Sequence, residues 1–307
     1  MIISASRRTD IPAFYSEWFM NRLREGYTLV PNPRNPSRLG KVNLLPDIVD
    51  CIVFWTKNPR PMFDKMDELD RMGYSYYIQF TLTPYDKSIE KYLPPKEKLI
   101  DTFVEMSQRI SRKRSVWRYD PIIIDERFSV QWHIEQFAIM CEKLHRYTNC
   151  CILSFVDPYK SIGDRFRGLT NNEIYAVAAG ISKIAKAHAI SLFTCAEKID
   201  LSKYGIQHGA CINQSLIEQI IGSPIKAKND TNQRTDCCCI EAVDIGAYDT
   251  CPHGCAYCYA TSSKKMMEHF VATHDPLAPM IIGYPRGDEI ITDRTTVSQK
   301  INQISMF

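Results

Sequence analysis

The sequence has little that would suit a membrane, a nucleic acid or a disordered state. No apolar run approaches the roughly 20 residues that cross a bilayer, and neither an internal repeat nor a low-complexity tract is present. The formal net charge of +3 is too small to indicate nucleic acid or an anionic membrane surface as a partner. No secretory segment accompanies the twelve cysteines, which favours a reducing compartment. We therefore expect a cytoplasmic protein that contacts neither nucleic acid nor a membrane directly.

The sequence does have an alternation of short apolar runs and longer segments with helical periodicity. This alternation is typical of βαβ units and a parallel sheet. Eight candidate strands in 307 residues favour an α/β fold, a TIM-like (β/α) barrel, complete or partial. The candidate strands cover residues 2–6, 27–30, 51–55, 76–82, 115–119, 150–156, 190–195 and about 242–247. The candidate helices cover residues 12–24, 61–72, 95–111, 130–147, 171–187 and 214–221.

Segments outside this alternation complete the expected organisation. A proline-punctuated loop follows residue 30, and a polar stretch over 222–239 is interpreted as a long functional loop. Asn171, with Thr170 before it, is the candidate N-cap of the helix that follows. We expect one domain over residues 1–307, with a C-terminal cluster-binding extension that comprises a loop at 251–258 and residues 259–307.

Polar and charged side chains follow the apolar strands at the points where these strands end. In a barrel, the carboxyl ends of the strands form the mouth of the active site, so these side chains are expected to converge on one polar pocket. Buried charges must pair or bind something, and Arg118 beside Asp120 fits an ion pair as well as a ligand contact. The side chains are Arg7 and Asp10 after the first strand, Lys57 after the third, Arg118 and Asp120 at the fifth, and Asp157 and Glu197 after the next two.

Cys251, Cys255 and Cys258 form a compact loop directly after the last candidate strand. A [4Fe–4S] cluster takes four ligands, usually cysteine thiolates. Three cysteines in CxxxCxxC spacing would therefore hold three irons and leave the fourth open to a small molecule. The spacing predicts such a centre beside the expected polar pocket.

Two other readings of the loop stay open. A structural zinc site would need a fourth ligand, from His253 or an upstream cysteine, and so would a cluster used only for electron transfer. The remaining cysteines are also ambiguous. A second metal centre would need about four of Cys195, Cys211, Cys237, Cys238 and Cys239 to converge, whereas Cys51, Cys141, Cys150 and Cys151 suit small core residues.

The cysteine spacing, with Tyr257 in the aromatic position before the last cysteine, resembles the cluster loop of the radical S-adenosylmethionine (SAM) superfamily. Those barrels usually carry the loop after the first strand, whereas here it follows the last. First and last strands are neighbours in a closed barrel, so the loop can keep its place in space. This order resembles a small bacterial family with a C-terminal motif, the queuine-lyase type. Matching segments cover 4–10, 54–59, 118–121, 244–246 and the cysteine loop, so the resemblance spans essentially the whole chain.

The resemblance implies a [4Fe–4S] cluster that binds SAM at its open iron. One-electron reduction by a donor such as flavodoxin or ferredoxin would release a 5′-deoxyadenosyl radical, which would act on a small polar heterocycle. In a queuine lyase, cleavage of the C–N bond of queuine would yield a deazapurine amine for queuosine-precursor salvage.

The resemblance also implies roles for the strand-end residues. Asp10, Asp120 and Asp157 are candidate catalytic residues, because carboxylates suit the diol and the amino-pyrimidinone edge of queuine. The adenine of SAM is expected near Tyr257. The carboxylate of SAM calls for a basic group and its ribose for a polar or acidic one. Arg118, Lys57 and Arg7 are the basic candidates, and Glu197 is the acidic one.

Overall fold

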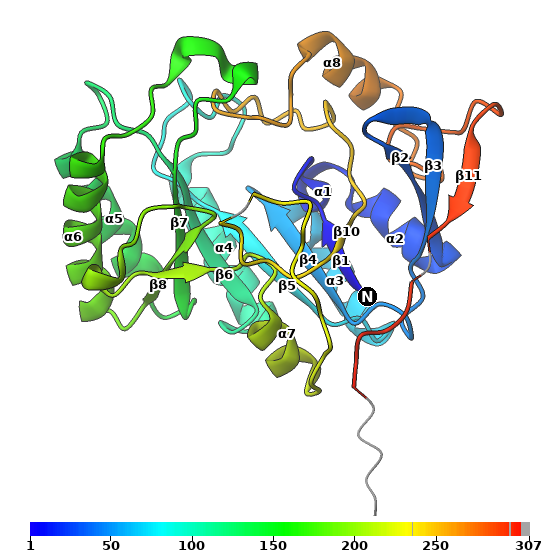
Figure 1. Cartoon of the computed structure of the whole chain (residues 1–307), viewed down its shortest axis with the longest axis horizontal. Coiled ribbons are helices and arrows are strands. Elements are labelled where there is room, and N and C mark those ends of the chain that lie inside the picture. The colour runs from blue at the N-terminus through cyan, green and yellow to red at the C-terminus, as the bar shows by residue number, and fades with distance from the viewer. Residues whose placement is uncertain (235, 295, 302–307) are drawn as a thin grey trace, which may run out of the picture.

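The computed structural model describes residues 1–234, 236–294 and 296–301. Its main element is an eight-stranded sheet in which all neighbouring strands are parallel, ordered β10-β1-β4-β5-β6-β7-β8-β9 (Figure 1). Within the described residues, no helix is long and apolar enough to cross a membrane. The strands are β1 Ile2–Ala5, β4 Cys51–Thr56, β5 Tyr76–Thr81, β6 Ser115–Ile122, β7 Cys150–Phe155, β8 Ser191–Cys195, β9 Gln207–Gly209 and β10 Val243–Asp244.

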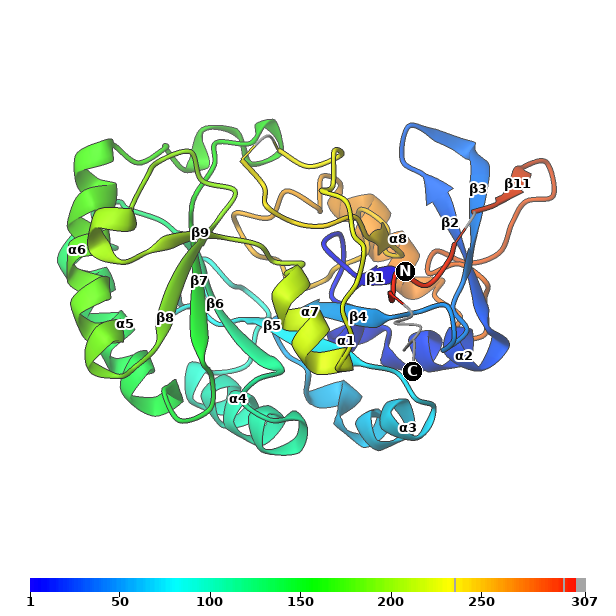
Figure 2. The same cartoon turned by 60° about the horizontal axis from the view of Figure 1, so that its bottom comes forward.

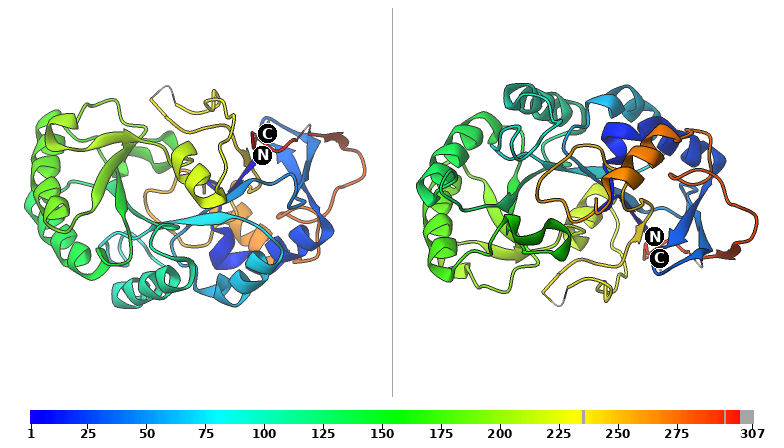
Figure 3. Two further views of the ribbon diagram at one scale, coloured as in Figure 1. Left: turned by 90° about the horizontal axis from the view of Figure 1, so that it is seen from below. Right: turned by 90° about the horizontal axis from the view of Figure 1, so that it is seen from above.

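Helices α2 to α6 lie along the outer side of the curved sheet (Figure 3). The expected helix ranges are confirmed, although two of the expected helices are each divided into two shorter ones. Amphipathic spacing explains the packing, since α4 buries Leu99, Phe103, Met106 and Ile110 at intervals of three and four residues. The helices are α1 Ile11–Phe14, α2 Ser16–Glu25, η1 Arg60–Lys65, α3 Met66–Arg71, α4 Lys96–Ile110, α5 Val130–Leu144, η2 Lys160–Arg165, α6 Asn171–Ala187, η3 Ser202–Tyr204, α7 Gln214–Ile221 and α8 Lys264–Ala272.

The sheet is buried on both faces, as its near-continuous apolar strands require. Alternate residues point to opposite faces, so β4 sends Ile52 and Phe54 toward the helices, while Cys51 and Val53 face inward. The inward residues pack against side chains of α7 and of the segment that follows it, including Ile217 and Ile240.

The two edge strands, β9 and β10, do not pair with each other in the described part of the chain. The expected α/β architecture is therefore present as an open, curved parallel sheet. The segment after α7, drawn in yellow, lies across the side that the sheet leaves open (Figures 2 and 3). Residues 222–239, between α7 and β10, contain no helix or named strand where they are described, in agreement with the expected long loop.

One expected strand of the main sheet is wrong. Residues 27–30 belong to β2 Tyr27–Asn32, which forms a hairpin with β3 Asn35–Asn43 in a separate three-stranded sheet. The proline-punctuated segment is thus largely strand rather than loop. Pro36 is tolerated because the third strand, β11 Ile290–Asp293, pairs only with residues 38–41 of β3. The short β9, which was not expected, takes the eighth place in the main sheet.

The C-terminal extension returns to the beginning of the chain. Within it, β11 pairs in parallel with β3, and α8 lies above α1 and β2 in Figure 1. Asp50 accepts hydrogen bonds from the hydroxyl of Ser298 at 2.5 Å and from the amide of Gln299 at 2.7 Å. These contacts hold residues 298–299 against the segment that leads into β4.

The start of α6 shows which residue caps this helix. Thr170 is the cap: its hydroxyl accepts a hydrogen bond from the Glu173 amide, and Glu173 accepts one from the Thr170 amide. The expectation that Asn171 caps this helix is therefore wrong by one residue, because the Thr-x-x-Glu spacing forms a capping box.

We expect Thr170→Ala to lower the free energy of unfolding by about 1 kcal/mol, because the cap bond is lost. Asn171→Ala is the matched control and should change it by less than about 0.5 kcal/mol. Urea unfolding followed by circular dichroism measures both values. An equal loss in the two variants would contradict the capping assignment.

Candidate functional site

A cavity of about 470 Å³ opens at the carboxyl ends of the parallel strands. This volume lies within the range of about 300–1,000 Å³ that is usual for small-molecule sites. Of the strand-end residues and the loop residues Cys251, Cys255, Tyr257 and Cys258 proposed in the sequence analysis, all but Glu197 line this cavity. The lining candidates are Arg7, Asp10, Lys57, Arg118, Asp120, Asp157, Cys251, Cys255, Tyr257 and Cys258.

Asp244 joins the last strand of the sheet to the first. Its carboxylate accepts hydrogen bonds from the Ser4 hydroxyl at 2.7 Å, the Ser6 hydroxyl at 2.6 Å and the Arg7 amide at 2.9 Å. Gly246 follows because a Cβ at this position would lie 2.1 Å from the Ser6 oxygen. The Asp-Ile-Gly sequence thus lets the chain pass close to β1 on its way to the cysteine loop.

The cysteine loop is held by the segment that follows β5. The amide of Ala256 donates to the carbonyl of Ile89 at 2.8 Å, and the amide of Tyr92 donates to the carbonyl of His253 at 3.1 Å. Gly254, with φ of +68°, makes the turn between the first two cysteines in a conformation that favours glycine. These backbone contacts fix the loop at the wall of the cavity.

Glu90 is the central charge beneath this loop, and sequence reasoning missed it. Its buried carboxylate accepts hydrogen bonds from Lys57 Nζ at 2.7 Å, Thr83 Oγ1 at 2.9 Å, Lys96 and the hydroxyl of Tyr257. Burial raises the pKa of Glu90, but the two lysines outweigh burial and the net pKa is lowered to about 2. Glu90 therefore stays ionised at neutral pH and anchors Tyr257.

Asp10 connects the first strand to the cysteine loop. Its Oδ1 accepts from the Ala13 amide at 3.0 Å, and its Oδ2 accepts from the Lys57 amide at 2.7 Å. The carboxylate is an acceptor, so His253 Nε2, at 2.7 Å, donates its proton to Asp10 Oδ2. Both oxygens are thus committed to donors within the protein. This arrangement favours a positioning role, and catalysis by Asp10 stays a prediction.

Arg118 and Asp120 form the ion pair that their spacing allowed. Arg118 Nε lies 3.1 Å from Asp120 Oδ2, and Ser154 donates to the other oxygen of Asp120. Asp157 differs, because it lies at the rim with its side chain 39% exposed and pairs with Arg234 at 2.6 Å. Of the three candidate catalytic carboxylates, Asp157 is the most accessible from the cavity mouth.

The thiols of the loop line the cavity wall. Burial raises the pKa of Cys255 to about 12 and that of Cys251 well above its ordinary value, so a bound cation would favour the thiolates. By chemistry, three thiolates at the wall of an open cavity fit an iron–sulfur cluster with one iron left unligated. Among the described residues, the three sulfurs do not form a group within 4.8 Å of one another. The cluster and zinc readings both stay predictions.

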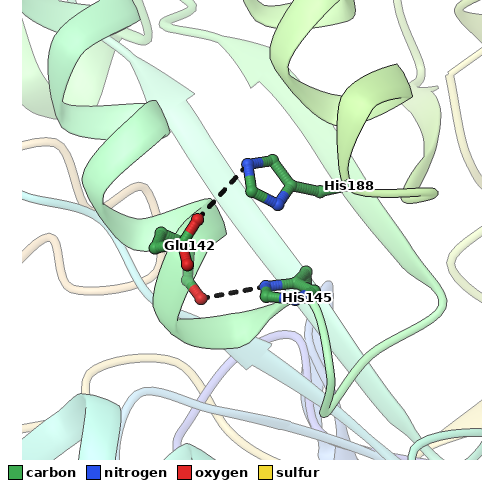
Figure 4. Close-up of side chains that lie close together, drawn as sticks. All are labelled: Glu142, His145 and His188. Atoms are coloured by element: carbon green, nitrogen blue, oxygen red, sulfur yellow. Dashed lines mark hydrogen bonds and ion pairs between the residues drawn. The ribbon is translucent and has the colours of Figure 1, made fainter.

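The group of potential ligand atoms that does meet this distance lies elsewhere. Glu142, His145 and His188 approach one another at the carboxyl ends of α5 and α6 (Figure 4). Helices run antiparallel to the strands that they connect, so this end of the fold is opposite the cavity. The group takes no part in the candidate site.

Glu197 is not among the residues that line the cavity; its carboxylate accepts a hydrogen bond from the Phe155 amide at 2.9 Å. Burial raises the pKa of Glu197 to about 7. It is therefore a carboxyl group that can carry a proton near neutral pH. As a partner for the ribose of SAM, it stays a prediction.

We expect Glu197→Gln to change how stability depends on pH. The folded protein holds this proton up to about pH 7, whereas the unfolded chain releases it near 4.5, so wild type loses stability between these values as the pH rises. The variant should lack this contribution. Its free energy of unfolding relative to wild type should rise by about 1–3 kcal/mol from pH 4.5 to pH 7.5. Urea titrations at both pH values measure the difference, and a constant difference would contradict the buried-carboxyl assignment.

Replacement of Glu90 by Gln should destabilise the site, because Lys57 and Lys96 lose their shared counter-charge. Removal of one partner from a buried ion pair costs about 3–5 kcal/mol. Glu105→Gln is the control, since the ion pairs of Glu105 with Arg60 and Arg109 lie at the surface and contribute little to stability. Urea unfolding at neutral pH compares the two, and equal losses would exclude Glu90 as the central charge.

Comparison with known proteins identifies a family. Residues 2–260 match the family described as "Domain of unknown function (DUF1848)". No curated protein matches the chain. A solved structure from Bacteroides thetaiotaomicron VPI-5482, provisionally described as an alpha-L-fucosidase, aligns with 57% of this chain and 84% of its own at 11% identity and a TM-score of 0.28. Similarity of that size bears on neither fold nor activity. Because the family match spans most of the sequence, from the first strand through the cysteine loop, the chain belongs to the DUF1848 family.

Proposed function

We propose that this protein is a radical SAM enzyme that acts on a small polar heterocycle. The observation that carries the proposal is the position of Cys251, Cys255 and Cys258 on the wall of a charged cavity at the carboxyl ends of a parallel sheet. When bound, a [4Fe–4S] cluster and SAM would supply a reducing electron and a 5′-deoxyadenosyl radical. Everything else would be positioning, proton control and exclusion of water by the chain itself.

The loop residues would hold the cluster at a fixed place. Cys251 would stay close to β1 because Asp10 binds His253 from the first strand–helix connection. Cys255 would stay opposite Glu90, with which it forms an isolated β-bridge. The hydroxyl of Tyr257 is held by Glu90. The centre of its ring lies 5.2 Å from Lys57 Nζ, in a cation–π contact. An aromatic ring fixed beside the open iron suits the expected adenine of SAM.

The basic candidates for the carboxylate of SAM differ in how many donors they have free. Lys57 is bound to Glu90, and Arg118 is bound to Asp120 and Gln79. Arg7 stacks on Trp55, with 5.0 Å from its guanidinium carbon to the ring centre. These groups make the cavity wall positive, and a ligand carboxylate would replace or share their present partners.

The substrate side of the cavity offers hydrogen-bonding groups of both kinds. Asp157 and Arg234 lie together at the rim, and Ser154 and Asp120 lie deeper. Carboxylates beside hydroxyl and guanidinium donors suit a compound that carries a diol and an amino-pyrimidinone edge. Queuine has this combination, so C–N cleavage of queuine, a lyase reaction in queuosine-precursor salvage, is the specific reaction we propose. Asp157 is the preferred substrate contact.

The proposal predicts reductive cleavage of SAM by the anaerobically reconstituted protein. With dithionite, SAM and queuine, we expect 5′-deoxyadenosine together with a deazapurine amine, both detected by mass spectrometry. The variant Cys251→Ser/Cys255→Ser/Cys258→Ser should form neither product, because it cannot hold the cluster.

Cys238→Ser is the matched control, because Cys238 is exposed and should be dispensable for activity. A reconstituted protein that binds SAM but never forms 5′-deoxyadenosine would refute the radical SAM assignment. Formation of 5′-deoxyadenosine with queuine left intact would refute the substrate alone.

A further inference from the structure

We infer that Cys195, Cys211, Cys237 and Cys239 form a second iron–sulfur site, separate from the cysteine loop. The four residues come from three parts of the chain: the end of β8, the connection after β9, and the long loop after α7. All four line the same cavity. The inference does not depend on the proposed function, because it concerns other ligands.

The four thiols approach one another at the cavity wall. The sulfurs of Cys195 and Cys211 lie 2.9 Å apart. Cys239 Sγ accepts a hydrogen bond from the amide of Ile212, the residue that follows Cys211, at 3.3 Å, and Cys237 is two residues away from Cys239 in the chain. Two cysteines separated by one residue thus lie beside two that come from the β8–β9 edge of the sheet. Convergence of four thiols is the requirement for a complete [4Fe–4S] ligand set.

Donors directed at these sulfurs support an anionic centre. The amide of Ile212 donates to Cys239 Sγ at 3.3 Å, and Arg118 Nη1 donates to Cys211 Sγ at 2.6 Å. Hydrogen bonds to cluster sulfurs are a usual way in which proteins stabilise the negative charge of iron–sulfur centres and set their potential. The carbonyl of Cys211 is fixed by Gln79 Nε2 at 2.6 Å and by the Tyr77 hydroxyl.

Arg7 adds a positive charge that lacks a full set of partners. Its Nη2 is buried and has no hydrogen-bond partner among the described residues. The nearest carboxylate contact, with Asp230, is 4.0 Å long. A cluster with four thiolates carries net negative charge and would provide the missing acceptor.

The sulfurs must move for either a cluster or a zinc ion to bind. Tetrahedral zinc would hold all four sulfurs about 3.8 Å from one another. In the described part of the chain, no three of these cysteines lie mutually within 4.8 Å, and the sulfurs of Cys195 and Cys211 are 2.9 Å apart. Metal analysis of the reconstituted protein separates a cluster from zinc.

The expected role differs from that of the cysteine loop. Four thiolates would saturate the irons, so this site has no open position for a ligand. It suits electron transfer, and it would also tie the long loop to β8 and to the connection after β9. The two cysteine sets therefore divide the cavity wall into a ligand-binding side and a saturated side.

The test uses the full chain with Cys251, Cys255 and Cys258 replaced by Ser, so that only the second site remains. Anaerobic reconstitution with iron and sulfide should load about four irons and four sulfides per chain, with brown absorption that bleaches on reduction. Further replacement of Cys195 and Cys239 by Ser should abolish this loading. Cys238→Ser in the same background should retain it, and circular dichroism checks that each variant is folded.

Other results would overturn the inference. Zinc as the retained metal, a Cys195–Cys211 disulfide detected by mass spectrometry, or no iron above that of the Cys195→Ser/Cys239→Ser variant would each do so. The reciprocal protein, with Cys195, Cys211, Cys237 and Cys239 replaced and the loop cysteines intact, should still load about four irons. Its failure would count against the cysteine-loop cluster, so the two proposals can fail separately.

Discussion

The pairing of the last strand of the sheet with the first is the constraint on which the site depends. Only two residues of β10 pair with β1, so backbone hydrogen bonds alone give it a short attachment. The carboxylate of Asp244 adds bonds to Ser4, Ser6 and the Arg7 amide. Those bonds join residues some 240 positions apart in the sequence. They also place the cysteine loop beside the carboxyl ends of the other strands. A cluster loop late in the sequence is compatible with this cavity for that reason.

Charge balance beneath the loop is the second requirement. One buried carboxylate, Glu90, accepts hydrogen bonds from two lysines, a threonine and a tyrosine, so that two positive charges share one negative charge. On the other wall, Asp120 alone pairs with Arg118, whose remaining donors turn to Gln79 and a cysteine sulfur. Arg7, whose Nη2 has no hydrogen-bond partner among the described residues, adds a second positive charge to that wall. An anionic group among the upstream cysteines would balance it.

Much of the fold and part of the site were predictable from sequence. Helix ranges followed from apolar periodicity, and the strand-end residues converged because all strands of the sheet are parallel. The strand at 27–30 was misplaced because its partner, β3, contains a proline and reads as loop. Glu90 was missed because it lies in no periodic segment, and its importance comes from contacts with Lys57 and Tyr257. The meeting of Cys195 with Cys211 likewise depends on β8 and β9 being neighbours, which no local pattern reveals.

The late position of the cysteine loop also fixes the order in which the site can be assembled during protein synthesis. Seven of the eight strands of the main sheet, from β1 to β9, leave the ribosome before β10 and the loop. Since domains begin to fold as the chain emerges, the helix-covered sheet can form around a cavity that still lacks the loop cysteines. Under the proposed function, iron and sulfide would be delivered to the loop only after residue 258 has been made. An upstream centre, whose last ligand is Cys239, would be ready for loading first.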